Sequence, residues 1–355
     1  MFLQNWRLQF GYNLFFFVYL PSQTQQVVKF IMKQTISSIV FLLFSLCTFS
    51  STINFRFATK VEGQLLKTAD TAYFNKFSQS DLDWRMCKEN SSLDEYIAYC
   101  SEQVQDFTSD EQQIISKAIS TIEDSLKALG CQLPIPDDIV FIKTTMKEEG
   151  GAAAYTIKNQ IYIGSEFVKY CNGENPRASV FFTSIVAHEL FHCISRYSPS
   201  FRQQMYALIG FTVMDEEIDF PESVRKRIIT NPDVERYDSY GTFTINGQPR
   251  RCALMSLYTK TWKEAYAEQK DQATFFNNID AVLIPLDDLS TSYSLKQCDV
   301  VSDFWTQVGE NTAYVIAPEE CMADNFSFAI IPSMPRNEYK SAWLIQGIIN
   351  TLGKN

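Results

Sequence analysis

Apolar residues recur at helical spacing in three long stretches of the chain. Residues 109–129 carry isoleucine, alanine and leucine at intervals of three and four, begin with a capping box of Ser109 and Gln112, and end before a glycine. Residues 175–196 begin with an asparagine cap followed by proline, as many helices do. Residues 318–329 begin with proline and acidic residues and continue with an apolar face. These patterns predict three helices.

Shorter apolar runs predict strands. Residues 139–142 form an uninterrupted apolar run, as expected of a buried strand, and residues 161–163 alternate after a turn at residues 159–160. The 161–163 strand is either a sheet edge, where an extended peptide could add through backbone hydrogen bonds, or an interior hairpin strand. Residues 242–245 and 253–258 lie between turn-forming residues and predict further strands.

Together these elements predict an α+β fold. We expect a small mixed sheet with a buried helix, followed by a β-rich insertion and a helical C-terminal part. Residues 51–108 show only short helical patterns and no candidate chemistry, so a removable propeptide is one interpretation of them. The expected segments are an upstream extension, a signal peptide, an N-terminal helical region, a part that carries the buried helix, the β-rich insertion and the helical end, at residues 1–31, 32–50, 51–134, 135–230, 231–300 and 301–355.

The N-terminal residues resemble a secretory signal. A Met-Lys pair at residues 32–33 precedes an apolar run at residues 36–46, and residues 48–50 supply a small-x-small cleavage pattern. Because that methionine is the natural start of such a signal, residues 1–31 would be a non-native extension. This predicts an exported protein, secreted or periplasmic. The alternative is a membrane anchor helped by the apolar residues 13–20, although both runs are short for a span of about 20 residues.

Composition and charge are those of an ordinary globular protein. Apolar residues make up 46% and charged residues 20% of the 355-residue chain, which argues against intrinsic disorder. Lys and Arg number 31 against 41 Asp and Glu, giving a formal net charge of −10. This balance argues against a nucleic-acid-binding protein, which would usually carry a basic surface.

The cysteines predict disulfides. Nine are present and Cys47 falls in the signal segment, which leaves eight, an even number in a protein expected to be exported. No Cys-x-x-Cys pair occurs, so a cysteine metal site is not indicated. The simplest pairings are local, Cys87 with Cys100 and Cys252 with Cys298.

Both histidines of the chain lie in one motif, His188-Glu189-Leu190-Phe191-His192. Residues at i and i+4 share a face of a helix, so His188 and His192 can present two imidazole nitrogens to one metal ion. Glu189 lies about 100° round the helix, where its carboxylate can reach a water rather than the metal. The alternative is a pair of hydrogen-bonded histidines in a buried apolar helix, which would leave several polar groups in need of partners.

A third ligand is needed, because a catalytic zinc ion usually has three protein ligands and one position for water. No histidine remains, so the third ligand must be a carboxylate. Among the glutamates after the motif, only Glu320 has an aspartate four residues on, Asp324, and both lie in the predicted 318–329 helix. Asp324 is then spaced to accept a hydrogen bond from a ligating histidine. The other candidates for the third ligand are Glu216, Glu217 and Glu222.

The motif of residues 188–192 together with Glu320-Cys321-Met322-Ala323-Asp324 resembles the gluzincin metallopeptidases, the thermolysin-like branch of the zincins. The order of elements resembles that family over residues 135–330. The resemblance implies a zincin-like fold and one Zn²⁺ ion bound by His188, His192 and Glu320. It also implies that Glu189 is the catalytic base and that Asp324 orients a histidine. The chain departs from thermolysin in the longer separation between the second histidine and the third ligand.

The hypothesis from the sequence is therefore an exported zinc metallopeptidase that acts on a peptide or protein substrate. Zinc would polarise the scissile carbonyl, and Glu189 would take a proton from water and pass it to the leaving amine. A further donor should stabilise the oxyanion, and Tyr314, Tyr155 and Tyr240 are the candidates.

Two other functions remain open at this stage. The protein could be a non-catalytic exported zinc-binding module of zincin fold, in which a closed site staples helices and a partner fills the cleft. Cys193 or Cys321 could then supply a fourth ligand as a thiolate, or the two could form a disulfide. The other possibility is a zinc hydrolase that acts on a substrate other than a peptide. Oligomeric state is not indicated by any pattern.

Overall fold

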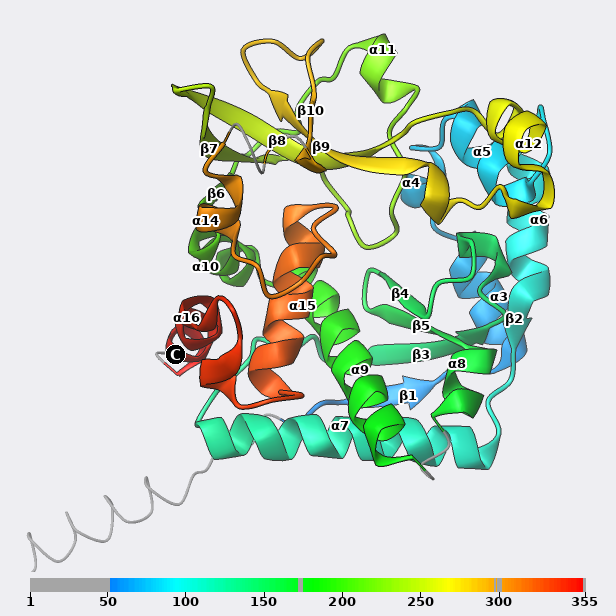
Figure 1. The fold of residues 1–355 in the computed structure, drawn as a ribbon. Helices are drawn as coiled ribbons and strands as arrows, with labels where there is room; N and C mark the ends of the chain where they lie inside the picture. Colours follow the sequence, from blue (N-terminus) through cyan, green and yellow to red (C-terminus); the bar gives the residue numbers. More distant parts are fainter. Residues whose placement is uncertain (1–51, 172–174, 297, 299–301, 354–355) are drawn as a thin grey trace, which may run out of the picture. The chain divides into compact units, whose positions relative to one another are not determined.

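The computed structural model describes residues 52–353, apart from 172–174, 297 and 299–301. The predicted upstream extension and signal peptide, residues 1–31 and 32–50, lie outside the described residues. The described part of the chain contains two β-sheets, with helices in their connections, between them and after them (Figure 1). This is the mixed α and β content that was predicted.

The first sheet is mixed. Its strand order is β1-β3-β5-β4, in which β1, β3 and β5 run parallel, β4 is antiparallel to β5, and β2 pairs with the end of β3. The strands are β1 (Phe55–Phe57), β2 (Val104–Gln105), β3 (Ile139–Thr144), β4 (Ala154–Ile157) and β5 (Gln160–Gly164). The strand predicted at residues 161–163 is β5, which lies inside the sheet. The edge is its hairpin partner β4, so the edge interpretation was wrong for β5.

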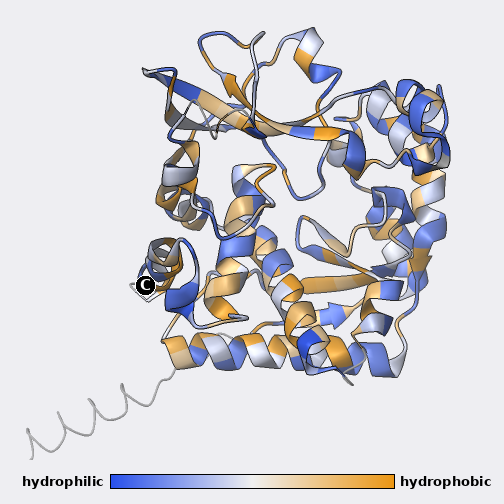
Figure 2. Ribbon diagram, viewed as in Figure 1, coloured by the Kyte–Doolittle hydropathy of each residue, from blue (hydrophilic) through white to orange (hydrophobic). Residues whose placement is uncertain are grey.

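The central strand β3 shows why this sheet is buried on both faces. All six of its residues are buried, and it is apolar along most of its length (Figure 2). Ile139 and Phe141 pack into the larger core, which α7 and α9 share, while Val140 and Ile142 pack into a second core against the N-terminal helices. Successive residues of a strand point to opposite faces, so an uninterrupted apolar run feeds both cores.

The N-terminal helices belong to the fold. Gly63 of α3 lies so close to the sheet that a Cβ atom there would be 2.8 Å from a Val104 side-chain carbon, and β1 pairs with β3. Removal of residues 51–108 would therefore take away β1, β2 and one wall of the second core, which argues against a propeptide. The helices of this region are α3 (Lys60–Thr68), α4 (Thr71–Phe74), α5 (Gln79–Met86) and α6 (Leu93–Gln103).

The three predicted helices are confirmed, with small changes at their ends. They are α7 (Ser109–Leu129), α9 (Pro176–Tyr197) and α15 (Pro318–Ile330). The capping box of α7 uses Thr108 and Glu111, one residue earlier than the predicted pair, and Gly130 ends the helix with a φ of 65°. Helix α9 is long and apolar enough to cross a bilayer, but here it is the buried central helix of the larger core. Shorter helices α8 (Ser165–Tyr170) and α10 (Pro199–Leu208) flank it.

The second sheet is antiparallel throughout, with the order β10-β9-β8-β7-β6. Its strands are β6 (Phe211–Val213), β7 (Ser239–Ile245), β8 (Gln248–Tyr258), β9 (Ile279–Pro285) and β10 (Tyr293–Ser294). Asn246 and Gly247, with φ of 51° and 80°, make the tight turn between β7 and β8. The sheet begins with β6 at Phe211, upstream of the range predicted to be β-rich. Helices α11 (Glu222–Arg225) and α12 (Trp262–Gln269) lie in its connections.

The C-terminal part is helical. Helix α15 packs beside α9, with the rings of Phe191 and Phe326 5.5 Å apart (Figure 1). This contact brings the two predicted metal-binding segments together. Two further helices complete this part, α14 (Phe304–Val308) and α16 (Ala342–Leu352).

The cysteines are mostly buried thiols. Cys87 and Cys100 are both free, so the predicted pairing of these two is not formed in this structure. Cys252 is also a free thiol, and its burial raises its pKa to about 12, so the predicted pairing of Cys252 with Cys298 is not formed in this structure either.

Candidate metal centre

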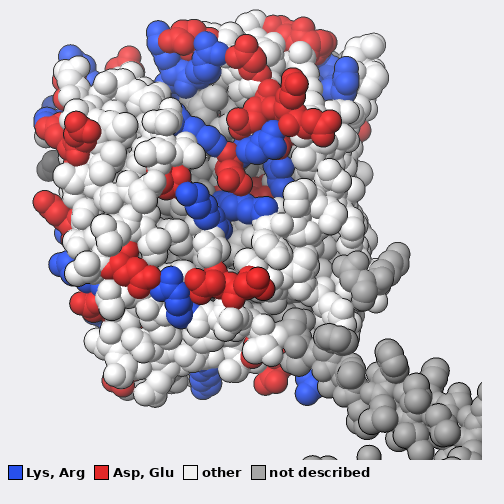
Figure 3. Space-filling model, turned by 180° about the vertical axis from the view of Figure 1, so that it is seen from behind, with Lys and Arg blue, Asp and Glu red and all other residues white. Residues whose placement is uncertain are grey.

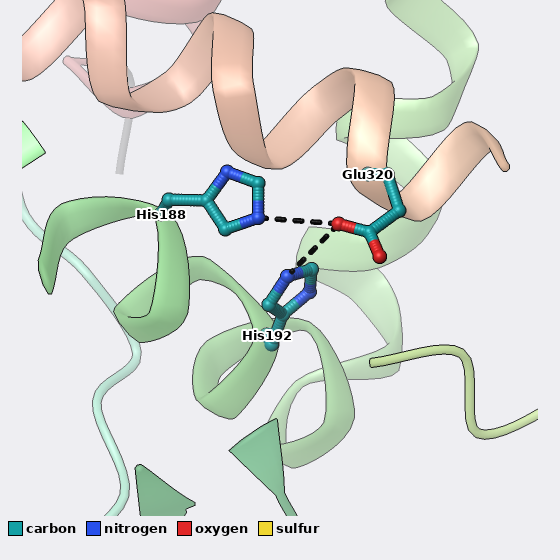
Figure 4. Close-up of side chains that lie close together, drawn as sticks. All are labelled: His188, His192 and Glu320. Atoms are coloured by element: carbon teal, nitrogen blue, oxygen red, sulfur yellow. Dashed lines mark hydrogen bonds and ion pairs between the residues drawn. The ribbon is translucent and has the colours of Figure 1, made fainter. Parts of the chain in front are cut away.

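Helix α9 presents its two histidines on one face, toward helix α15. The imidazole rings of His188 and His192 are 4.8 Å apart, and Glu320 points between them from α15 (Figure 4). Oε2 of Glu320 lies 3.2 Å from Nε2 of His188 and 3.5 Å from Nε2 of His192. All three side chains are buried. The structure thus brings together two histidines and an acid that are more than a hundred residues apart in sequence.

These three side chains fit a zinc ion. Two ligands of a tetrahedral zinc at about 2.0–2.1 Å from the metal lie roughly 3.3 Å apart, close to the two distances above. Nε2 of His192 is buried and has no hydrogen-bond partner within the part of the chain that the structure describes, although buried polar atoms are usually satisfied. A metal ion would give this nitrogen a partner. The group of His188, His192 and Glu320 therefore has the donor atoms and the spacing of a three-ligand zinc site.

The other nitrogen of each imidazole faces a carboxylate. Nδ1 of His188 lies 2.8 Å from Oδ1 of Asp324, and Nδ1 of His192 lies 3.1 Å from Oε1 of Glu319. Such contacts fix the ring orientation and direct Nε2 toward a metal. Tyr206 donates a hydrogen bond of 2.5 Å to Glu319. Sequence reasoning singled out Asp324 but not Glu319, although its place beside Glu320 in the first turn of a helix was a usable signal.

Glu189 lies beside this group and is held by strand β4. Oγ1 of Thr156 donates a hydrogen bond of 2.7 Å to Oε2 of Glu189, and both residues are buried. Burial raises the pKa of Glu189, which suits a carboxylate that must accept a proton near neutral pH. Thr156 was not singled out from the sequence, because a lone threonine in a strand carries no signal.

A loop that precedes the second strand of the second sheet completes the centre. Nδ2 of Asn231 donates a hydrogen bond of 2.5 Å to Oε1 of Glu320. The buried Asp233 accepts a 2.6 Å hydrogen bond from the backbone N–H of Thr156, and its Oδ1 lies 3.9 Å from Nε2 of His192. The sequence indicated only a turn here, and nothing in the Asn-Pro-Asp pattern connects it to a site far away in the chain.

Helix α5 holds that loop in place through Thr230. Asp81 accepts hydrogen bonds from the backbone N–H of Thr230 (3.0 Å) and from its hydroxyl (2.9 Å). Arg85 donates to the carbonyl oxygen of Thr230 (2.5 Å) and pairs with Asp81 at 3.1 Å. All three residues are buried. The N-terminal region, which showed no candidate chemistry in the sequence, thus positions two residues of the centre.

The centre has an excess of acids. Burial opposes a charge on either imidazole, but hydrogen bonds to Asp324 and Glu320 hold the pKa of His188 well above its usual range. Burial is likewise outweighed at His192, where Asp233 and the other acids raise the pKa to about 10. Such shifts mark a site that favours positive charge, which either protons or a metal cation can supply. Five carboxyl groups surround the two imidazoles: Glu189, Asp233, Glu319, Glu320 and Asp324.

Burial also raises the pKa of Asp233 well above its usual range, and the charge of Glu189 adds to the effect. A cation bound nearby acts in the opposite direction, because its charge favours the ionised carboxylate.

The centre opens into a cleft of about 810 Å³. Tyr314 lines this cleft, whereas the hydroxyl of Tyr155 is buried against Glu148 and Tyr240 stacks with Arg251 elsewhere. The glutamates named as other third-ligand candidates are exposed and outside the metal group. Apolar side chains on α9 and at the C-terminal end of α15 form much of the wall: Val180, Phe181, Ile185, Phe328 and Ile331.

The cysteines next to the proposed ligands do not contribute to the group. Cys193 and Cys321 are buried free thiols, and the predicted disulfide between them is not formed in this structure. Burial raises the pKa of each to about 12, so neither is predisposed to be a thiolate ligand.

The charged side chains on one face of the molecule do not indicate a binding surface for a strongly charged partner. On the face opposite to that of Figure 1, basic and acidic side chains are interspersed around a hollow, without a broad field of one sign (Figure 3).

Comparisons of the chain with protein-family models, with curated proteins and with solved structures gave no match. The chemistry of the centre has to be inferred from its own residues.

Proposed function

We propose that the protein is a zinc-dependent metallopeptidase with a zincin-like centre, which hydrolyses peptide bonds in a peptide or protein substrate. The observation that carries this proposal is the meeting of His188 and His192, one turn apart on α9, with Glu320 from α15 at 3.2 and 3.5 Å. The order of elements supports it as well, because a mixed sheet with an antiparallel edge strand precedes the histidine helix.

Each residue of the centre has its own role in the proposed reaction. His188, His192 and Glu320 would hold one zinc ion, which when bound supplies a Lewis acid that polarises a carbonyl and acidifies water. Glu189 takes a proton from the attacking water and later gives it to the leaving amine. Thr156 orients the Glu189 carboxylate by its hydroxyl. Tyr314, on the wall of the cleft, is the donor that we assign to the developing oxyanion.

An open centre is favoured over a closed structural one. A structural zinc site has four protein ligands. The further acids near Nε2 of His192 are Glu189 and Asp233, which are engaged by the hydroxyl and by the N–H of Thr156, respectively. The 810 Å³ cleft leads directly to the ligands. These features support catalysis over a non-catalytic zinc module, which is the second function that we consider.

The test combines metal analysis with peptide cleavage. We expect about one zinc per full-length chain, and cleavage of a peptide library that Glu189→Gln lowers by about 10²-fold or more in kcat, with zinc content unchanged. Glu166→Gln is the matched control, because Glu166 is an exposed glutamate before α9 and should leave both quantities as they are. Stoichiometric zinc without Glu189-dependent cleavage would contradict the peptidase proposal and favour the binding module.

A further inference from the structure

Strand β4 is the edge of the first sheet, and a single carboxylate closes that edge beside the metal centre. In the order β1-β3-β5-β4, one side of β4 faces β5, and no strand of the described residues pairs with its other side. The N–H of Thr156 on the open side is bound by Oδ1 of Asp233 at 2.6 Å. Upstream of Thr156 the edge is accessible, because residues 152–154 line the large cleft. An extended peptide could therefore follow β4 only as far as Asp233.

Asp233 lies within about one residue's length of the metal-binding atoms. Oδ1 of Asp233 lies 3.9 Å from Nε2 of His192, and ligand atoms of Glu189, His192 and Asp233 all lie within 4.8 Å of one another. One residue of an extended chain spans roughly 3.3 Å. A peptide whose scissile carbonyl lies at the centre therefore comes within reach of Asp233 about one residue away along its chain. An endopeptidase would need the chain to continue further on that side.

Charge and direction decide which end of a peptide fits there. A carboxylate attracts an ammonium group and repels a terminal carboxylate. A peptide that pairs antiparallel to β4 would place its amino-terminal end near Thr156 and its remaining residues along residues 152–154. The remainder of the peptide would then lie in the open 810 Å³ cleft.

A small pocket beyond Asp233 can receive the first side chain. It has a volume of about 70 Å³, shares Asp233 and Tyr314 with the large cleft, and is too small for a continuing chain. Its apolar lining comes from the loop before Asp233 and from the segment that leads into β9: Ile229, Phe275, Phe276 and Ile279.

We propose that Asp233 binds the free α-amino group of a peptide, so that this centre removes single residues from amino termini. The proposal rests on the proposed peptidase function and specifies its substrate class. The bond that breaks is the first peptide bond: the water oxygen joins the carbonyl carbon of residue one, and the nitrogen of residue two takes the proton that Glu189 carried. No oxidant or other co-reactant is needed.

The test compares substrates that differ only at the amino terminus. Quenched fluorescent peptides of one sequence, with a free, an acetylated or a des-amino terminus, are offered to the full-length zinc-loaded protein. We expect kcat/KM for the free terminus to exceed the other two by about tenfold or more, as for a charge-assisted contact. Equal rates, or cleavage at internal bonds of the blocked peptides, would overturn the proposal.

Variants assign that preference to Asp233. Asp233→Asn should reduce cleavage of the free peptide to the level of the acetylated one, whereas Glu235→Gln, which removes an exposed carboxylate of the same loop, should retain the preference. If Asp233→Asn retains the preference for the free terminus, the assignment of that preference to Asp233 is wrong. If that variant does not fold, Asp233→Ala, which also removes the carboxylate, replaces it, and a preference unchanged within about twofold has the same meaning.

A binding measurement separates this proposal from the peptidase proposal. Zinc-loaded Glu189→Gln protein is titrated calorimetrically with the free and the acetylated peptide, and the free peptide should bind about tenfold more tightly. If no peptide is hydrolysed by the wild type but this difference is present and depends on Asp233, the amino-group site stands and the peptidase proposal fails. Equal affinities for the free and the acetylated peptide would contradict the proposed amino-group site.

Discussion

At the residue scale, the centre depends on acids that hold imidazoles in place. Asp324 and Glu319 each contact the Nδ1 atom of one histidine and so fix the orientation of both rings. Glu320 faces the opposite side of the rings, at their Nε2 atoms. The acids also give the centre its preference for a cation. A metal site of this kind is disturbed by changes that never touch the metal.

Substitution of these acids should therefore lower the zinc affinity, by an amount that depends on which acid is replaced. We expect Asp324→Asn and Glu319→Gln each to weaken zinc binding by about 10–100-fold, because the imidazole loses the carboxylate that orients it. Glu320→Ala should remove stoichiometric zinc altogether. Competition with a chromogenic chelator measures these affinities, with the exposed Glu338→Gln as control. Wild-type affinity in Glu320→Ala would remove Glu320 from the ligand set.

Residues that act through local spacing could be predicted from the sequence, and residues that act through folding could not. His188, Glu189 and His192 share one helical turn, and Glu320 and Asp324 share another, so their geometry follows from helix periodicity alone. Thr156, Asn231 and Asp233 reach the same centre from a strand and a loop. Their sequence neighbours carry no periodic signal, and only tertiary contacts bring them there.

At the scale of elements, the loop of residues 229–233 is the least expected part of the centre. It connects α11 to β7 and is held by Asp81 and Arg85 of α5 through three hydrogen bonds to Thr230. The loop in turn supplies Asn231 to Glu320. A helix in the N-terminal region thus determines where a loop of the insertion lies.

Weakening the clamp should loosen that loop without unfolding α9. Asp81→Asn replaces a buried carboxylate that is paired with Arg85, so we expect a loss of about 1.5–3 kcal/mol in stability. Amide hydrogen exchange at residues 229–234 should become at least about tenfold faster, whereas the amides of α9 should still exchange in the same sequence, from fastest to slowest, as in the wild type. Hydrogen-exchange mass spectrometry measures both. Asp94→Asn, at an exposed position on α6, is the control, and unchanged exchange in the loop would refute the clamp.

Long elements were predicted better than short ones. The helices α7, α9 and α15 have enough turns for their periodicity to be evident, and their caps shifted by one residue at most. Strands β1 and β6 have three residues each and β2 has two, which is too short for an alternating pattern. The interior position of β5 also could not be read from its own residues, because it is set by pairing with β3.

At the scale of the whole molecule, a buried ion pair joins α7 to the first sheet. Nζ of Lys143 on β3 lies 2.8 Å from the carboxylate of Glu111, and both side chains are buried. Burial opposes the ionised form of Glu111, but the hydrogen bond from Lys143 outweighs it and holds the pKa of this carboxyl below its usual value. The pair therefore contributes stability while Glu111 is ionised.

This pair predicts a pH-dependent difference in stability. The folded-state pKa of Glu111 is lowered, so its contribution is complete above the unfolded pKa of about 4.3 and is lost as pH falls through the lower folded value. At pH 7 we expect Glu111→Gln to be less stable than the wild type by about 1.5–3 kcal/mol. The gap should close toward pH 3. Urea unfolding followed by tryptophan fluorescence measures it, and a gap that persists at low pH would contradict this role.

The α+β class and the order of segments could be predicted because hydrophobic patterns report which side of an element is buried. The pairing of distant strands could not, because β1 and β3 are separated by more than eighty residues and nothing in β1 specifies its partner. The same limit applies to the closing of β4 by Asp233, which depends on how the second sheet sits against the first part of the chain.

Strand β1 sets a boundary for any proteolytic maturation of this chain. Ile53 is buried, with its backbone N–H bound to Glu123, and the three residues of β1 pair with β3. A protease that trimmed the chain beyond this point would expose the backbone of β3 as a new, apolar sheet edge, a common starting point for aggregation. A mature N-terminus compatible with a soluble protein must accordingly lie before Ile53.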